Sequence, residues 1–338
     1  MTGLVLAGAS LLTGLVAASP SPAACAGEDL LAIHGKWVMR PYERMRNGVP
    51  QADVQQVAQR VERIARLFRA AYPEPRGTEA VGYWDFRGSG RPYPYAFNSL
   101  YKSWYCNTNL GKVMVGDETF NWAYAFVNHL NWFAALQKDF RVDGRAVYLL
   151  TPRSGELKGR PAYAGIGNRN SNTGQTFSRA VLITRPGRSP LQPVTRQAFL
   201  QSFLASSEAR QQKNLASLQH SSLDPARKAE ALRKMQASFD RDLAPAREML
   251  RTLSAQEGAE PAIVGPLGTA GFKEFASEQR GQALVFLDRA YFDRRLPPAA
   301  PQFVVVYWSW ENNPPSHNFR AEFERNVDLD ALAALLDR

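Results

Sequence analysis

The spacing of apolar residues along the chain predicts a few helices separated by many short strands. Between residues 52 and 71 the apolar positions fall three and four apart, which places them in one stripe along a helix. Two longer helices are predicted, one to about residue 218 and one from 224 to 253, because Thr195 and the pair Asp224-Pro225 are typical helix starts. The short link between them predicts an antiparallel helical hairpin inserted at about 195–255.

Strands are predicted from short runs that are rich in aromatic and β-branched residues and are bounded by Gly, Pro or Asn. These runs are residues 81–86, 101–106, 112–115, 122–127, 146–150, 180–183, 283–287 and 303–308. The segment 120–133 fits both a helical and a strand period. With a short helix at 329–336, the order of elements predicts an α+β protein. It has a mostly antiparallel sheet, an N-terminal helix and the inserted hairpin.

The N-terminus has the pattern of a secretory signal peptide. Residues 4–18 form an apolar run and residues 19–27 are small and turn-prone, although no Lys or Arg precedes the run. We therefore expect a signal peptide at 1–26, a single mature domain at 27–338 without a membrane-spanning helix, and a secreted or periplasmic location. Cleavage after Ala23 would retain Cys25 and allow a disulfide with Cys106, whereas cleavage after Ala26 would remove it.

Positive charge is concentrated in residues 141–213. The chain has 41 basic and 31 acidic residues, and this segment alone has twelve basic residues against three acidic ones. Ten of the twelve are Arg, the residue best suited to bidentate contacts with anions. We expect an Arg/Asn-rich face here that binds an anionic partner. Its predicted ligand-binding residues are Arg169, Asn170, Asn172, Arg179, Arg185 and Arg188.

The polar loop predicted at 165–178 is not a nucleotide-binding loop. Gly174 is followed by Gln175 where a phosphate loop needs Lys, and Asn170 occupies the place of the third Gly of a dinucleotide motif. The four histidines lack metal-ligand spacing. No cofactor and no metal site are therefore predicted.

Candidate catalytic residues are few. Asp85 follows Trp84, and Asp117 and Glu118 precede Trp122, so these carboxylates are candidates for a glycoside hydrolase cleft lined by aromatic rings. A lyase would instead use Tyr163 with Arg169 and Asn170. No nucleophile motif of the G-x-S-x-G type occurs.

These patterns favour a binding role over catalysis. The leading hypothesis is an exported protein that binds an anionic polysaccharide, envelope phosphate groups or extracellular nucleic acid through its basic face. A hydrolase or lyase acting on polysaccharide is the second hypothesis. A structural or partner-binding envelope protein that uses the helical hairpin is the third. The sequence leaves the ligand and the oligomeric state open.

Overall fold

The computed structural model describes residues 25, 29–41, 48–88, 90–117, 119–165, 169–171, 174–265 and 271–337, with backbone alone at 169–171 and 174–175. The predicted signal peptide therefore lies outside the described residues apart from Cys25. Glu118 and Asn172 lie outside them as well.

In the larger of two sheets, the central strand β15 (Phe303–Glu311) pairs with β5 (Trp122–Val127) on one side and β11 (Gly174–Thr184) on the other. The sheet order is β1-β2-β3-β5-β15-β11-β9-β8, and all its pairs are antiparallel except β1 with β2. The other strands are β1 (Trp37–Met39), β2 (Thr78–Phe86), β3 (Tyr95–Asn107), β8 (Arg153–Leu157) and β9 (Arg160–Ala164), with β4 (Lys112–Val115) on β3 and β10 (Arg169–Ser171) on β11.

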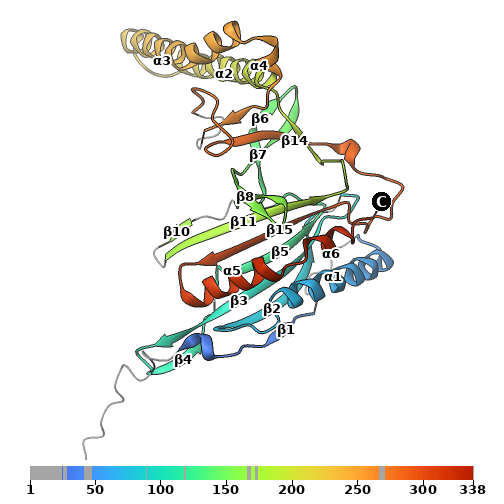
Figure 1. Cartoon of the computed structure of the whole chain (residues 1–338). Helices are drawn as coiled ribbons and strands as arrows, with labels where there is room; N and C mark the ends of the chain where they lie inside the picture. The colour runs from blue at the N-terminus through green and yellow to red at the C-terminus, as the bar shows by residue number, and fades with distance from the viewer. Residues whose placement is uncertain are drawn as a thin grey trace, which may run out of the picture.

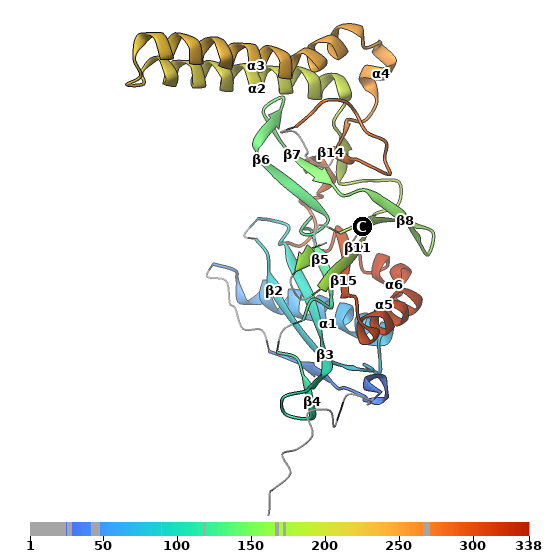
Figure 2. The ribbon, with the colours of Figure 1, turned by 90° about the vertical axis from the view of Figure 1, so that its left-hand side faces the viewer.

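Helices cover one face of this sheet (Figures 1 and 2). They are α1 (Gln51–Ala71), α5 (Pro314–Asn326) and α6 (Leu329–Ala333). Successive side chains of a strand point to opposite faces, so Val304, Val306 and Trp308 of β15 pack among the helices. There they join Phe68 of α1 and Phe323 of α5 in one core. The predicted stripe of α1 is buried as expected.

A smaller sheet packs on the opposite face. Its order is β12-β14-β7-β6, with β13 paired to β14, and every pair is antiparallel. Its strands are β6 (Ala134–Val142), β7 (Arg145–Leu150), β12 (Leu191–Pro193), β13 (Ile263–Val264) and β14 (Gln282–Leu287). Val305 and Tyr307 of β15 share the core between the sheets with Phe133 and with Val285 of β14. The two sheets are therefore joined by a continuous apolar layer.

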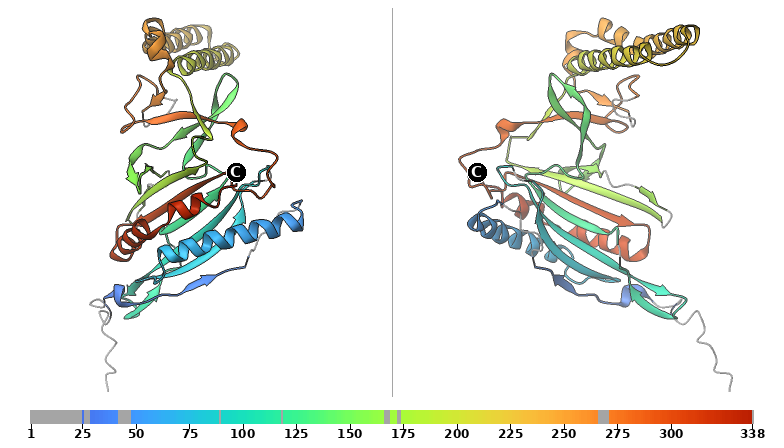
Figure 3. Two further views of the ribbon diagram at one scale, coloured as in Figure 1. Left: turned by 45° about the vertical axis from the view of Figure 1, so that its right-hand side comes forward. Right: turned by 180° about the vertical axis from the view of Figure 1, so that it is seen from behind.

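The helical hairpin projects from the far side of the smaller sheet, at the opposite end of the molecule from β4 (Figure 3). Its helices are α2 (Arg196–Gln219) and α3 (Pro225–Thr252), and α4 (Ala255–Ala259) follows. The predicted caps are present, because the Thr195 hydroxyl accepts from the Ala198 amide at 3.2 Å and Asp224 accepts from the Arg227 amide at 3.0 Å. Phe199 of α2 and Leu243 of α3 pack on the smaller sheet, which anchors the inner half of the hairpin.

These elements confirm the predicted α+β class with its mostly antiparallel sheet and N-terminal helix. The segment 165–178 departs from the prediction. It is not a polar loop throughout, because β10 and the first residues of β11 form a hairpin within it. At Gly165 an added Cβ would lie 2.5 Å from a ring carbon of Tyr307, so only glycine lets this edge approach β15.

A disulfide joins Cys25 and Cys106, as predicted for a chain that retains Cys25. It connects the segment before β1 to the end of β3. Within the described part of the chain, no helix has the length and apolar character needed to cross a membrane.

Candidate functional site

A cavity of about 470 Å³ opens on the large sheet, on the face opposite α1. Its position follows from the alternation in β5, where Ala123 and Ala125 face the helices while Trp122 and Tyr124 face away from them. The lining residues are Arg40, Pro41, Tyr83, Trp84, Asp85, Arg87, Leu100, Trp122, Tyr124 and Trp132. We call this space the aromatic cavity.

Trp132 reaches the aromatic cavity from the connection between β5 and β6. Its ring centroid lies 5.9 Å from that of Trp122 and 5.8 Å from that of Tyr307. Its φ is 60°, in the left-handed region, which is unusual and strained for a bulky residue. The connection is held at its start by Asn128, whose side-chain amide donates to the Ala300 carbonyl at 2.9 Å. The backbone thus carries strain while it presents an indole ring to the cavity.

Charged groups lie beside these rings. Arg87 and Asp85 form an ion pair of 2.8 Å, with about a quarter of each side chain exposed. Arg87 also donates to the side-chain oxygen of Asn98 at 2.6 Å, and its guanidinium lies 5.5 Å from the Phe126 ring centroid. Arg40 is exposed at the cavity edge. The aromatic cavity therefore offers ring faces together with a carboxylate and two guanidinium groups.

A second cavity, of about 480 Å³, adjoins the first because Trp132 lines both. His129 lies in its wall, where burial, and then the charge of Arg87, lower the pKa of the imidazole. The Nδ1 atom of His129 accepts from the Asn131 amide at 3.1 Å, which places the ring proton of the neutral form on Nε2. The lining of this middle cavity is mostly apolar and also includes Tyr148 and Leu287.

A third cavity, of about 490 Å³, adjoins the second through Tyr148 and Leu287. Its basic lining residues are Arg141 near the end of β6, Arg145 at the start of β7 and Arg289, which follows β14. None of the three forms an ion pair with any residue that the structure describes. We call this the arginine cavity, and the three adjoining cavities together the groove.

The predicted ligand-binding arginines whose side chains are described, Arg179, Arg185 and Arg188, do not share one surface. Arg169 and Asn170 lie on β10, where only the backbone is described, and Asn172 lies outside the described residues. Arg179 faces the helices from β11, in an ion pair with Glu324 of α5 at 3.2 Å. The segment 141–213 does contribute Arg141 and Arg145 to the arginine cavity, so part of its charge gathers in one place.

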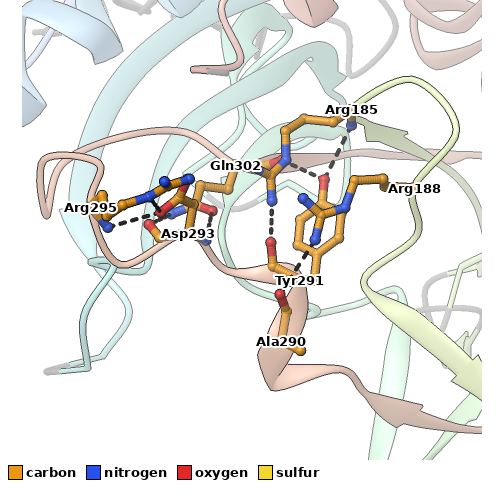
Figure 4. A network of polar contacts seen from close by, with 7 residues as sticks. All are labelled: Arg185, Arg188, Ala290, Tyr291, Asp293, Arg295 and Gln302. Atoms are coloured by element: carbon orange, nitrogen blue, oxygen red, sulfur yellow. Dashed lines mark hydrogen bonds and ion pairs between the residues drawn. The ribbon is translucent and has the colours of Figure 1, made fainter.

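Arg185 and Arg188 lie against Tyr291, between β11 and the turn that follows β14 (Figure 4). Arg185 is buried, and its guanidinium donates to the Tyr291 carbonyl oxygen. The Tyr291 hydroxyl in turn donates to the Gln302 carbonyl at 2.6 Å. Arg188 is exposed and donates to the carbonyl of Ala290, a residue that lines the arginine cavity, at 3.3 Å. Arg185 therefore stabilises the fold, and Arg188 lies beside the groove.

Arg179 gives a test of a structural role. Replacing it with Met is expected to lower the free energy of unfolding by about 1–2 kcal/mol, because Glu324 would lose one charged partner and keep another in Arg320. Chemical denaturation of the two proteins measures this loss. The affinity for ligand should be unchanged. Weaker ligand binding with an unchanged free energy of unfolding would contradict the structural role of Arg179.

The predicted catalytic carboxylates are not brought together. Asp85 lies opposite Ala96 on β3, whereas Asp117 follows Gly116, whose amide donates to Ser103 at the other end of that strand. Seven residues of strand separate these positions by about 23 Å, far beyond the 5–10 Å that a glycoside hydrolase pair needs. Glu118 lies outside the described residues. Among the described residues that line the aromatic cavity, Asp85 is the only carboxylate.

The lyase set is also dispersed in the sheet. Tyr163 of β9 pairs with Ala180, while Arg169 pairs with Thr176, four residues away along β11. Tyr163 packs edge-to-face on Phe133, and burial raises the pKa of its hydroxyl. A buried hydroxyl with a raised pKa is a poor base at neutral pH.

Comparisons with protein-family models, with curated proteins and with solved structures found no match. The chemistry of the groove is therefore argued from its own residues. Within the described ranges, no group of three or more His, Cys, Asp or Glu side chains is placed to hold a metal ion.

Several groove residues were not predicted from the sequence as ligand-binding residues. They are Arg40, Arg87, Trp132, Tyr148 and Arg289, which come from five separate parts of the chain. The one local signal was the aromatic segment 120–133, whose strand period places Trp122 and Tyr124 on one face. Arg289 lies outside the basic segment and carries no sequence signal of its own.

Proposed function

We propose that this is an exported binding protein whose groove holds a segment of an acidic polysaccharide. The observation that carries the proposal is the continuity of the groove. Trp132 connects the aromatic cavity to the middle one, and Tyr148 with Leu287 connects the middle cavity to the arginine cavity. An extended ligand could therefore contact aromatic rings at one end and guanidinium groups at the other.

The aromatic cavity suits neutral sugar residues. Indole and phenol rings provide flat apolar faces for pyranose rings, and their polar edges tolerate water. The Asp85 carboxylate beside Arg87 offers both an acceptor and donors for hydroxyl groups. Because Asp85 is paired with Arg87 and Arg40 lines the same cavity, charge does not decide between sugar and nucleic acid here, and the proposal of sugar rests on the ring faces.

The arginine cavity suits the acidic groups of such a polymer. Arg141 and Arg289 are exposed there and form no ion pair with a described residue, and the three guanidinium groups of the described lining outnumber its one carboxylate, Asp288, so a carboxylate or phosphate would meet a net positive charge. The Arg145 guanidinium is less available, because it lies 3.8 Å from the Phe286 ring centroid and donates to Gln192 at 3.3 Å.

Two further observations support an exported location. The disulfide between Cys25 and Cys106 is of a kind that persists in oxidising compartments and is rare in the cytosol. The apolar run at residues 4–18 precedes Cys25 and has the composition of a signal peptide. A secreted or periplasmic protein would meet acidic polysaccharides directly.

The proposal is tested by titrating the protein with polygalacturonate at increasing salt, with dextran as the neutral polymer. Binding to polygalacturonate should weaken as salt rises, since the charged contacts release counterions. Arg289→Glu is expected to weaken binding about 3- to 10-fold at low ionic strength, because a like charge then faces the ligand.

Arg233→Glu is the matched control, because Arg233 is exposed on α3, away from the groove, and the net charge changes equally. An equal loss for both variants would show that only the overall charge matters and would reject the groove. Tighter binding of single-stranded DNA than of polygalacturonate would replace the polysaccharide with nucleic acid.

A further inference from the structure

A fourth cavity, of about 300 Å³, lies between the two sheets and shares no lining residue with the groove. Its walls come from β11 and β9 of the large sheet and from β7, β12, β13 and β14 of the smaller one. The lining residues are Leu150, Thr151, Arg153, Tyr163, Leu182, Ser189, Leu191, Pro193, Pro261, Ile263, Glu278, Gly281, Ala283 and Val285. We call it the inter-sheet cavity.

The apolar walls of the inter-sheet cavity are only partly covered by the protein itself. Leu182, Leu191 and Ala283 are half-buried, although each lies on a strand that contributes to the core between the sheets. By contrast, Val181 and Ile183, which face the helices from the same strand β11, are fully buried. The sheets therefore leave apolar surface in contact with water where a ligand would cover it.

The polar groups at the rim balance in charge. The described lining contains one guanidinium group, that of Arg153, and one carboxylate, that of Glu278. Arg153 also forms an ion pair of 2.8 Å with Glu156, which is not part of the lining. Burial is the main cause of the raised pKa of the Tyr163 hydroxyl, and the charges of Arg153 and Glu278 act on this pKa in opposite directions. A strongly anionic ligand would meet the carboxylate and a cationic one the guanidinium, so this rim favours an uncharged molecule.

We infer that the inter-sheet cavity is a second binding site, which takes a small uncharged apolar molecule. A volume of about 300 Å³ is at the lower end of small-molecule sites, which fits one short aliphatic chain or a two-ring aromatic compound and excludes a two-chain lipid. Binding would bury the exposed parts of Leu182, Leu191 and Ala283. This site is independent of the groove and of the proposed polysaccharide.

The test uses N-phenyl-1-naphthylamine, an uncharged probe whose fluorescence rises in apolar surroundings. The full-length protein should show saturable binding of the probe. Ala283→Phe fills the cavity from β14 with a residue that strands accept readily, and it is expected to weaken binding at least about 10-fold. Ala237→Phe, at an exposed position on α3, should leave binding unchanged.

A second variant guards against misfolding of the first. Leu182→Thr places a β-branched residue, which strands accept readily, in β11 and removes part of the apolar wall, so binding should weaken by about 3- to 10-fold. Thermal unfolding shows whether both variants remain folded. Absence of saturable binding to the wild type, or equal affinity for wild type and folded Ala283→Phe, overturns the inference. Arg289→Glu should bind the probe with wild-type affinity. Probe binding therefore tests the inter-sheet cavity independently of polysaccharide binding in the groove.

Discussion

Trp132→Gly is expected to weaken the binding of polygalacturonate about 10- to 100-fold. The Trp132 ring lines both the aromatic cavity and the middle cavity, so its loss removes the stacking surface at their junction. Stacking of a ligand ring on an aromatic side chain contributes about 1–3 kcal/mol, and each 1.4 kcal/mol is about tenfold in affinity. Titration of the variant against the wild type at one salt concentration measures the change.

Glycine is the informative replacement because it accepts the φ of 60° that Trp132 adopts. The relieved backbone strain should offset part of the lost contacts with Trp122 and Tyr307, so the variant is expected to remain folded. Trp132→Phe keeps a smaller ring in place and should recover part of the affinity. If both variants bind as tightly as the wild type, the ligand does not lie over Trp132.

Removal of the disulfide is expected to produce the largest loss of stability. The double variant Cys25→Ala, Cys106→Ser should lose about 2–4 kcal/mol of unfolding free energy, because the bond closes a loop across 81 residues and restricts the unfolded chain. Denaturant unfolding under matched conditions gives the difference. The double variant leaves no free thiol, which prevents mispairing between molecules.

Wild-type protein in a reducing buffer serves as the companion measurement. It should lose as much stability as the double variant, whereas the double variant should not respond to the reductant. Equal unfolding midpoints for oxidised wild type and double variant would contradict this account. A peptide map that shows Cys25 absent from the mature protein would contradict the disulfide itself.

Elements with a strong local pattern were predictable from the sequence. The three-and-four spacing gave α1 to within one residue, and β4 and β5 have the predicted bounds. The pair Asp224-Pro225 marked the start of α3, because its cap uses neighbouring atoms only. Such signals depend only on residues that are close in the chain, so they predict an element without knowledge of the tertiary structure.

Two other elements were not predicted, one because its pattern is weak and one although its local signal is present. The strand β6 has exposed Lys138 and Asp139 in its middle, so its pattern is too polar to indicate a strand. Helix α5 was not predicted although Asn313 caps it and Pro314 occupies its first position. The final helix is shorter than predicted, ending at Ala333.

The groove could not be predicted because it depends on pairings between distant segments. Arg141 and Arg289 reach one cavity only because β7 pairs both with β6, which carries Arg141, and with β14, which precedes Arg289. The excess of Arg in 141–213 indicated an anionic ligand but not which arginines would be available. Arg179 and Arg185 are engaged by Glu324 and Tyr291, partners about 100 or more residues away in the chain.

The position of β15 in the large sheet determines when the sheet can form during synthesis of the chain. Strands β5 and β11 are adjacent to β15 on either side, yet 118 residues lie between the end of β11 and the start of β15. At about 5–20 residues per second, roughly 6–24 s pass during synthesis before β15 exists. Until then β5 and β11 each have an unpaired edge of the kind that pairs with other chains. The sheet therefore cannot close while the ribosome is still adding the first 300 residues, and the nascent chain needs protection from aggregation during that interval.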